Sequence, residues 1–191
     1  TFSIDRKNAT DTMMAMSAAK ALARELKEVV TPTIDRYRIA KYTAEALAAH
    51  TKEETLTTET AYSAFLEGSM VLFDAKGRIA FVTSAYYKAI KLDKNFVSSG
   101  DKGQEIAVTG AVGTIDKTTI IVAPADYFVK GTNFIICHPM AMTSPVKLAD
   151  YKIHENPQGI NGWLVEGRIY YDAFVLNNKK AAIYLSKQAA K

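Results

Sequence analysis

Residues 12–49 have the composition and spacing of one long helical segment. Residues 12–30 are rich in Ala, Met, Leu, Lys and Glu, which all have a high helix propensity. One apolar face repeats at helical spacing and comprises Ala15, Ala18, Leu22, Leu26 and Val29. The sequence therefore predicts a long helix near the N-terminus, and this helix is the element that the sequence indicates most strongly.

Pro32 interrupts the helical pattern. Within "TPTID", Thr31 can cap a new helix, Pro32 suits its first helical position and Asp35 suits its first turn. A second helical segment then covers residues 33–49. Because proline lacks a backbone donor, we expect the long helix, residues 10–49, to be kinked or broken within a residue or two of Pro32.

A short strand precedes the helix. Phe2 and Ile4 alternate with polar residues, which is typical of a strand with one buried face. Asn8, Thr10 and Asp11 then offer N-caps for the helix that follows.

Residues 163–175 alternate as a long β-strand does. The odd positions form a core face that comprises Trp163, Val165, Gly167, Ile169, Tyr171, Ala173 and Val175. The even positions mix apolar residues with charges of both signs, in Leu164, Glu166, Arg168, Tyr170, Asp172 and Phe174. We expect Val165, Ile169 and Tyr171 to be buried, Glu166 and Arg168 to be exposed, and the strand to be able to pair with the N-terminal one. A half-buried strand that faces water explains this pattern in most proteins, and the alternative is an outer face that contacts another subunit.

The middle of the chain contains shorter elements of both kinds. Residues 50–59 form a polar linker, and a helix from about Thr58 has Ala61, Phe65 and either Ser69 or Met70 on its apolar face. The further elements are a strand over residues 77–84, a helix capped by Ser84, strands on either side of an Asp116–Lys117 turn, a strand over residues 133–139, and a strand or irregular edge from residue 146. A last strand, about residues 181–186, follows a turn or crossing at Asn177–Asn178. This order predicts an α+β fold in which the two ends pack together around an inserted middle domain.

The composition excludes several classes of protein. With 191 residues and 48% hydrophobic residues, the chain can bury a substantial core. It contains no apolar run of about 18 residues, so no membrane-spanning segment is predicted. The net charge of +4 is small and spread along the chain, which disfavours sequence-specific nucleic-acid binding. A single cysteine, Cys137, cannot form an internal disulfide and fits a reducing compartment.

Two segments are candidates for chemistry, and neither has the required pattern. "GAVGTIDKTT" resembles a phosphate-binding loop, but it lacks the Gly-Lys-Ser/Thr triplet because Lys117 follows Asp116, so a β-turn is the better interpretation. Cys137 and His138 are neighbours, and neighbouring side chains on a strand point apart, which indicates a buried strand end rather than a nucleophile and its base.

The remaining candidates also favour structural roles. His50 and His154 show no zinc-ligand spacing. Glu166 and Asp172 could form a carboxylate pair, but Arg168 lies between them, so a cross-strand ion ladder is the ordinary explanation. A methionine cluster, Met13, Met14 and Met16, favours core filling or an interface over metal binding. We therefore predict no catalytic residue, no metal site and no cofactor.

Several segments together resemble a known family. They are "TFSIDRKNATDTMM", "VTPTIDRYRIA", "GRIAFV" and above all "HPMAMTSPVKLADYKIHENPQGINGWLVEGRIYYDAFVLNNKKAAIY". Together they are similar to the major capsid proteins of tailed bacteriophages and prophages, which have the Hong Kong ninety-seven capsid fold. The resemblance covers nearly the whole chain.

The resemblance implies an α+β capsid fold with two domains. Residues 1–54 and 139–178 would form a peripheral domain with a long spine helix and long strands. Residues 55–138 and 179–191 would form an inserted axial domain. The last strand would return to the axial domain, so Asn177–Asn178 would be a crossing between domains.

The resemblance also implies a structural function. The expected role is a coat protein that self-assembles into hexamers and pentamers of an icosahedral phage head around double-stranded DNA. Its partners would be other copies of the chain, DNA bound without sequence preference, and scaffolding or portal proteins. Its locations would be the virion and, during assembly, the host cytoplasm. The alternatives are an encapsulin-like compartment shell and, from another class, a small hydrolase or ligand-binding domain.

The even face of the long strand is the candidate assembly interface, with Glu166, Arg168, Tyr170 and Asp172. The chain starts at Thr1 rather than Met, and it lacks the N-terminal arm and extended loop of the family. We therefore expect a truncated fragment that folds as a monomer or small oligomer and forms no stable shell by itself.

Overall fold

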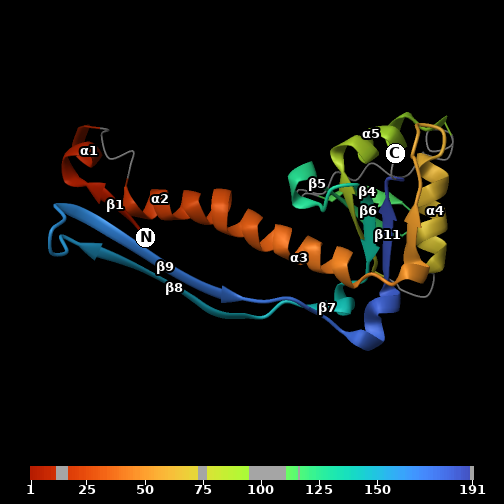
Figure 1. Ribbon diagram of the computed structural model, residues 1–191. Helices are drawn as coiled ribbons and strands as arrows, with labels where there is room; N and C mark the ends of the chain where they lie inside the picture. The colour runs from red at the N-terminus through yellow and green to blue at the C-terminus, as the bar shows by residue number, and fades with distance from the viewer. Residues whose placement is uncertain (12–16, 73–76, 95–110, 116, 190–191) are drawn as a thin grey trace. The chain divides into compact units, whose positions relative to one another are not determined.

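The computed structural model describes residues 1–11, 17–72, 77–94, 111–115 and 117–189 (Figure 1). The chain divides into two compact units. Unit 1 comprises residues 1–35 and 144–172, and unit 2 comprises residues 36–143 and 173–191. Each unit is therefore built from segments that are distant in the sequence.

Unit 1 contains an antiparallel sheet of three strands in the order β1-β9-β8. These strands are β1 (Phe2–Asp5), β8 (Val146–Glu155) and β9 (Gly162–Tyr171). Phe2 and Ile153 both pair with Val165, from opposite sides of β9. The predicted pairing of the N-terminal strand with the long strand is confirmed.

The long strand is shorter and less buried than predicted. It ends at Tyr171, and after an interruption β10 (Phe174–Val175) pairs with β7 (Met142–Thr143) within unit 2. Val165 is buried as predicted, but Ile169 and Tyr171 are only partly buried, so that part of the prediction is wrong. The reason is that β1 pairs only with residues 162–165 of β9, which leaves the rest of that edge uncovered.

Two helices of unit 1 begin at caps that the sequence analysis did not identify. The Asp5 carboxylate accepts a hydrogen bond from the backbone N–H of Lys7 (2.8 Å) at the start of α1 (Arg6–Asp11). The Ser17 hydroxyl accepts one from the N–H of Lys20 (3.4 Å) at the start of α2 (Ala18–Glu25). The predicted caps Asn8, Thr10 and Asp11 are wrong, because all three lie inside α1.

The helical pattern changes directly before Pro32. The residues Leu26–Val30 form a π-helical turn, and α3 (Thr31–Glu45) follows without a gap. The backbone N–H of Thr31 donates to the carbonyl of Leu26, five residues earlier. A wider turn relieves the clash between a proline ring and the carbonyl four residues before it, so the predicted irregularity is present as a π-turn rather than a break. Thr31 is not a cap, since its φ of −59° and ψ of −50° are helical.

The π-turn also shifts the apolar face of the helix by one position. Val29, predicted to be buried, is 49% exposed, while Val30 is half-buried and lines the same cavity as Leu22 and Leu26. The extra residue in the turn accounts for the shift, because the face continues at a spacing of four residues instead of three. Met13, Met14 and Met16 lie outside the described residues.

Unit 2 contains a sheet of six strands in the order β2-β11-β6-β3-β5-β4. Their bounds are β2 (Thr51–Glu53), β3 (Ile79–Thr83), β4 (Ala111–Ile115), β5 (Thr118–Ala123), β6 (Thr132–Cys137) and β11 (Ile183–Lys187). The helices of this unit are α4 (Ala61–Val71), α5 (Ser84–Leu92), the later part of α3, and short 3₁₀ turns at Ala48–His50, Ala125–Tyr127, Pro139–Ala141 and Asn177–Ala182. The predicted last strand is confirmed, and it pairs with β6 and β2.

Two local predictions for unit 2 are corrected. The polar linker contains β2, which pairs in parallel with β11 at the edge of the sheet, and its polar side chains give no strand pattern. The cap of α5 is Thr83 rather than Ser84, because the Thr83 hydroxyl accepts from the N–H of Tyr86 (3.3 Å).

Both faces of the large sheet are covered. On β6, Phe134 and Ile136 belong to a core cluster with α4 and α5, while Ile135 and Cys137 belong to a second cluster with Ile39 of α3. A central strand covered on both faces has a continuous apolar sequence, as "FIIC" does. Within the described parts of the chain, no helix is long and apolar enough to cross a membrane.

Candidate functional site

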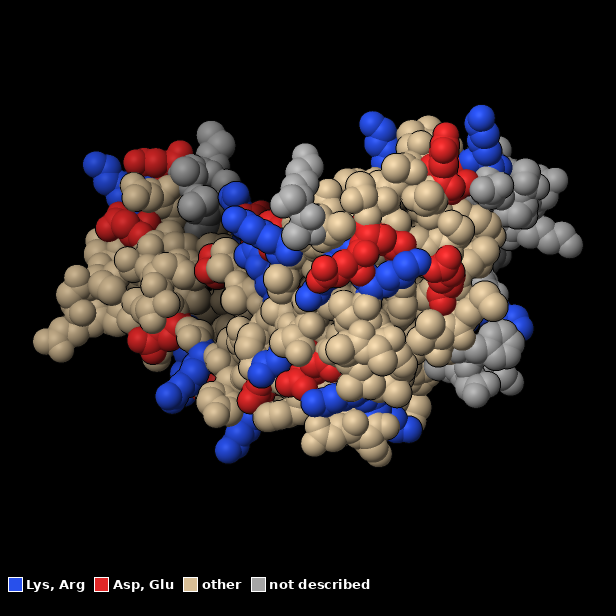
Figure 2. All heavy atoms as spheres, turned by 45° about the vertical axis from the view of Figure 1, so that its right-hand side comes forward, with Lys and Arg blue, Asp and Glu red and all other residues tan. Residues whose placement is uncertain are grey.

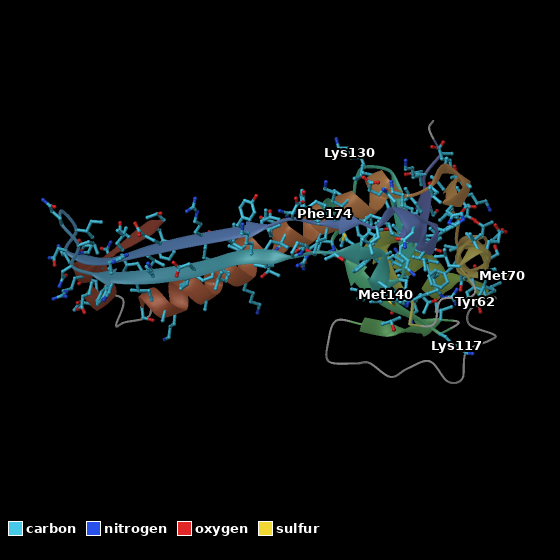
Figure 3. All side chains as sticks on the ribbon, turned by 90° about the horizontal axis from the view of Figure 1, so that it is seen from below. Tyr62, Met70, Lys117, Lys130, Met140 and Phe174 are labelled. Atoms are coloured by element: carbon cyan, nitrogen blue, oxygen red, sulfur yellow. The ribbon has the colours of Figure 1, made fainter. Side chains whose placement is uncertain are left out.

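One face of the β8–β9 ribbon in unit 1 carries a regular arrangement of charges. The antiparallel register places Asp150 opposite Arg168 and Lys152 opposite Glu166. We call these four residues, together with His154 and Tyr170, the ribbon face. Figure 3 looks onto this side of β8 and β9, and the helices of unit 1 lie behind the strands.

The ribbon face is exposed. The exposed side-chain fractions are 53% for Asp150, 64% for Lys152, 44% for His154 and 51% for Glu166. Tyr170, next to the end of β9, is a large aromatic residue and is nevertheless 64% exposed. The described residues of unit 1 therefore leave this face open to a partner.

The charges alternate in sign both along and across the strands. Lys152 Nζ lies 3.7 Å from Asp150 Oδ2 along β8, and His154 Nε2 lies 3.3 Å from Glu166 Oε2 across to β9. The register confirms the predicted cross-strand arrangement of opposite charges around Arg168. Because these side chains are about half exposed, each pair stabilises the monomer by less than about 1 kcal/mol.

The sequence analysis identified part of this face and missed another part. Glu166, Arg168 and Tyr170 lie on it together. Asp172 does not, because it follows the end of β9, where its backbone N–H donates to the carbonyl of Pro145 (3.2 Å). Asp150, Lys152 and His154 were missed, although their spacing of two in "DYKIH" indicates one exposed face of a strand.

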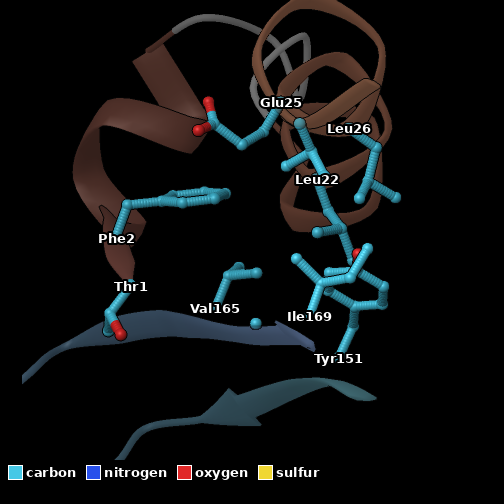
Figure 4. A pocket seen from close by; sticks show the side chains of 10 residues that line it. Thr1, Phe2, Leu22, Glu25, Leu26, Tyr151, Val165 and Ile169 are labelled. Carbon is cyan, nitrogen blue, oxygen red and sulfur yellow. The ribbon is translucent and has the colours of Figure 1, made fainter. Parts of the chain in front are cut away.

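The opposite face of the ribbon lines a cavity of about 280 Å³ beneath the helix (Figure 4). Its walls come from Leu22, Leu26 and Val30 of the helix and from Val165 and Ile169 of β9. The ring of Tyr151 lies across Gly167 at the floor of the cavity. A Cβ added to Gly167 would be 2.8 Å from this ring, so the close approach requires glycine there. Most of the lining residues are apolar, and Thr1, Glu25 and Tyr151 carry its polar side-chain groups.

A second charged cluster connects an edge strand to a helix in unit 2. Lys52 Nζ of β2 lies 3.1 Å from Glu54 Oε2 and also contacts Glu67 of α4. The hydrogen bonds that Lys52 donates to the carboxylates of Glu67 and Glu54 raise the pKa of Lys52 above its usual value. The cluster therefore has a structural role, since it fastens the polar edge strand to the helix beside it.

The segments that resembled catalytic motifs have ordinary structural roles. Within "GAVGTIDKTT", β4 and β5 pair in antiparallel fashion, with Ile115 opposite Thr118 and Lys117 at a φ of 60°. A strand and not a helix follows Lys117, which agrees with a β-turn rather than a strand-to-helix loop, while Gly110 and Asp116 lie outside the described residues. His138 Nδ1 accepts the N–H of Met140 (3.1 Å), while Cys137 is buried in the core with Tyr42. Among the described residues, no group of His, Cys, Asp and Glu is placed to hold a metal ion.

Burial controls the reactivity of Cys137. Desolvation of the thiolate raises the pKa of Cys137 to about 12, so the thiol stays protonated at neutral pH. We expect the folded protein to react with an iodoacetamide probe at pH 8 at least about a hundredfold more slowly than the denatured protein. Mass spectrometry can measure this cleanly, because the chain has one cysteine. Equal labelling rates in buffer and in denaturant would contradict the buried position.

The surface carries charges of both signs. On the face shown in Figure 2, Lys and Arg side chains lie beside Asp and Glu side chains. This mixture agrees with the small net charge of +4. A mixed surface is suited to contacts with other proteins more than to a continuous contact with a polyanion.

Comparisons with known proteins give matches at the level of structure. No protein-family model and no curated protein match the chain. The capsid structure of the cyanophage P-SCSP1u matches with a TM-score of 0.72 and 10% identity, over 100% of this chain and 71% of that one. Gordonia phage Cozz matches with a TM-score of 0.69 and 13% identity, over 100% of this chain and 69% of that one.

An encapsulin matches as well. The encapsulin complex from Synechococcus elongatus has a TM-score of 0.63 and 10% identity, over 98% of this chain and 71% of that one. At these identities the similarity concerns the fold. The α+β prediction is confirmed, and the chain has the Hong Kong ninety-seven-like fold of phage capsid proteins.

Proposed function

We propose that this chain is a structural shell protein, the coat subunit of a phage or prophage head. The observation that carries this proposal is the similarity of fold, which extends over 97–100% of the chain in the phage structures that match it. The exposed, mixed-charge ribbon face supports it, because a shell needs many repeated contacts between identical subunits. In this role the copies form the hexamers and pentamers of an icosahedral head around double-stranded DNA, with scaffolding or portal proteins as further partners.

The capsid assignment gives each part of the chain a place in the shell. Residues 1–54 and 139–178 act as the peripheral domain, and residues 55–138 and 179–191 act as the axial domain. The compact units divide the chain differently, since the first boundary lies within α3. This chain spans about 70% of the length of the matched phage chains.

An encapsulin-like compartment is the second candidate. The encapsulin match supports it, as does a match to a virus-like particle from Pyrococcus furiosus with a TM-score of 0.60. The two candidates differ in what the shell encloses, which is DNA in a phage head and protein in a compartment.

Electron microscopy of the full-length gene product tests both candidates. Closed particles whose nucleic acid resists nuclease support the phage head. Closed particles with protein cargo and no protected nucleic acid support the compartment. Absence of self-association of that full-length product at all protein and salt concentrations would contradict a shell function.

Reversal of one charge on the ribbon face tests the interface. We expect Arg168→Glu to lower the yield of assembled species several-fold and to leave the melting temperature of the monomer within about 1 °C, because Arg168 is exposed. Analytical ultracentrifugation and circular dichroism measure the two quantities. Arg24→Glu, an exposed reversal on α2, is the matched control and should assemble normally. A parallel loss of monomer stability would instead indicate that Arg168 acts within the subunit.

A further inference from the structure

We infer that the ribbon face binds the same face of a second copy of this chain, through an alternating pattern of charges that is complementary to itself. This inference rests on the proposed shell function and specifies one of its contacts. The residues that carry it are Asp150, Lys152, Glu166 and Arg168, which form two adjacent rows.

The pattern is a checkerboard of alternating charges. One row is Asp150 and Arg168, directly opposite each other, and the next row is Lys152 and Glu166. The negative charge is on β8 in the first row and on β9 in the second. Each charge therefore has an opposite charge as its neighbour in both directions.

Such a pattern pairs with itself under two-fold symmetry. If two ribbon faces meet about an axis parallel to the strands, Asp150 of each copy lies against Arg168 of the other, and Lys152 lies against Glu166. If the axis runs across the strands between the two rows, Asp150 lies against Lys152 and Glu166 against Arg168. Both arrangements give four intermolecular pairs of opposite charge, as an isologous contact requires.

The balance of charge favours a second copy over nucleic acid. The four residues have no net charge, since two are acidic and two are basic. A phosphate backbone needs an excess of positive charge, and the carboxylates would repel it. The exposed Tyr170 borders this area on β9, and large aromatic residues are enriched in protein interfaces.

An inverted variant tests the inference. Asp150→Lys, Lys152→Glu, Glu166→Lys and Arg168→Glu together reverse every sign of the checkerboard and keep the net charge and the opposite signs within each row. The contact of His154 with residue 166 is lost, because a lysine replaces the carboxylate there. Two inverted copies should therefore associate like two native copies. A native and an inverted copy would bring four like-charge pairs together, and we expect their association to be roughly tenfold weaker or more.

The experiment mixes the chains and counts the complexes. Nitrogen-15-labelled native protein is mixed with unlabelled inverted protein, and native mass spectrometry at low salt measures the fraction of mixed dimers. We expect that fraction to be about a tenth or less of the random value, and to rise towards it with salt as the charges are screened. Labelled and unlabelled native protein define the random value. The matched control exchanges the exposed Arg24–Glu28 pair (Arg24→Glu with Glu28→Arg), and it should mix randomly with native protein.

The possible failures are distinguishable. Random mixing of native and inverted copies overturns this inference and leaves the shell function standing. No self-association of native protein also overturns this inference, while the shell function has its separate test by electron microscopy. If the helix control also excludes native copies, the assignment to the ribbon face is wrong. If the inverted chain does not fold, a neutral variant replaces it, with Asp150→Asn, Lys152→Gln, Glu166→Gln and Arg168→Gln. We expect this variant to self-associate roughly tenfold more weakly than native protein. Unchanged self-association would overturn the inference.

Discussion

Replacement of Phe134 by alanine is expected to lower the free energy of unfolding of unit 2 by about 3–5 kcal/mol. The Phe134 ring is completely buried in the middle of β6. It stacks on Tyr86 with the ring centroids 4.6 Å apart, and it contacts Phe65 and Tyr184 at centroid distances of 5.7 and 6.0 Å. Its removal would leave a cavity between α4, α5 and the sheet, because three large rings cannot all move inwards to fill it.

The same substitution at an exposed position is the control. Phe174 is 54% exposed on β10, so Phe174→Ala should change the stability by less than about 1 kcal/mol (Figure 3). Urea denaturation followed by circular dichroism measures both variants. If the two variants lose the same stability, the core of unit 2 is not centred on Phe134.

The elements that the sequence predicted well are those whose burial follows from local pattern. β6 is apolar from Phe134 to Cys137 because both faces of the sheet are covered, and α4 shows its buried face in Ala61, Phe65 and Ser69. Met70, the alternative to Ser69, is 68% exposed (Figure 3). These patterns depend only on the order of residues within one element, so they can be recognised in the sequence without knowledge of the fold.

The features that the sequence did not reveal depend on partners distant along the chain. β2 is polar and becomes a strand only because the edge of β11 offers it hydrogen bonds. The π-turn before Pro32 moves burial from Val29 to Val30, which a fixed helical spacing cannot anticipate. Ile169 and Tyr171 have a core pattern, but β1 is too short to reach them.

The candidate interface could also be predicted only in part from the sequence. Alternation within β9 indicated Glu166, Arg168 and Tyr170. The β8 residues Asp150 and Lys152 belong to the same face only through the register between the two strands. A one-residue slip would move every side chain to the other face, so the complete charge pattern becomes visible only when the pairing is known.

Replacement of Gly162 by alanine is expected to detach β1 from β9 and to destabilise unit 1 by roughly 3 kcal/mol or more. Gly162 pairs with Asp5 at the start of β9. A Cβ at this position would lie 2.0 Å from the carbonyl oxygen of Ile4 and 3.0 Å from the backbone nitrogen of Arg6. Backbone atoms in a paired strand cannot rotate away as a side chain can, so β1 must shift, and the buried contact of Ile4 with Val165 is lost with it.

Hydrogen exchange measured by mass spectrometry can locate this effect. The amides of β1 and of residues 162–165 should exchange at least tenfold faster in Gly162→Ala, while those of β6 in unit 2 should be unchanged. Gly159→Ala is the matched control, because Gly159 also has a positive φ (83°) but has no atom within 4 Å of an added Cβ. Gly159→Ala should lower the stability only by the cost of an alanine in a left-handed conformation, about 1–2 kcal/mol. Equal effects of the two substitutions would mean that backbone conformation makes glycine necessary at residue 162, and not the close approach of β1.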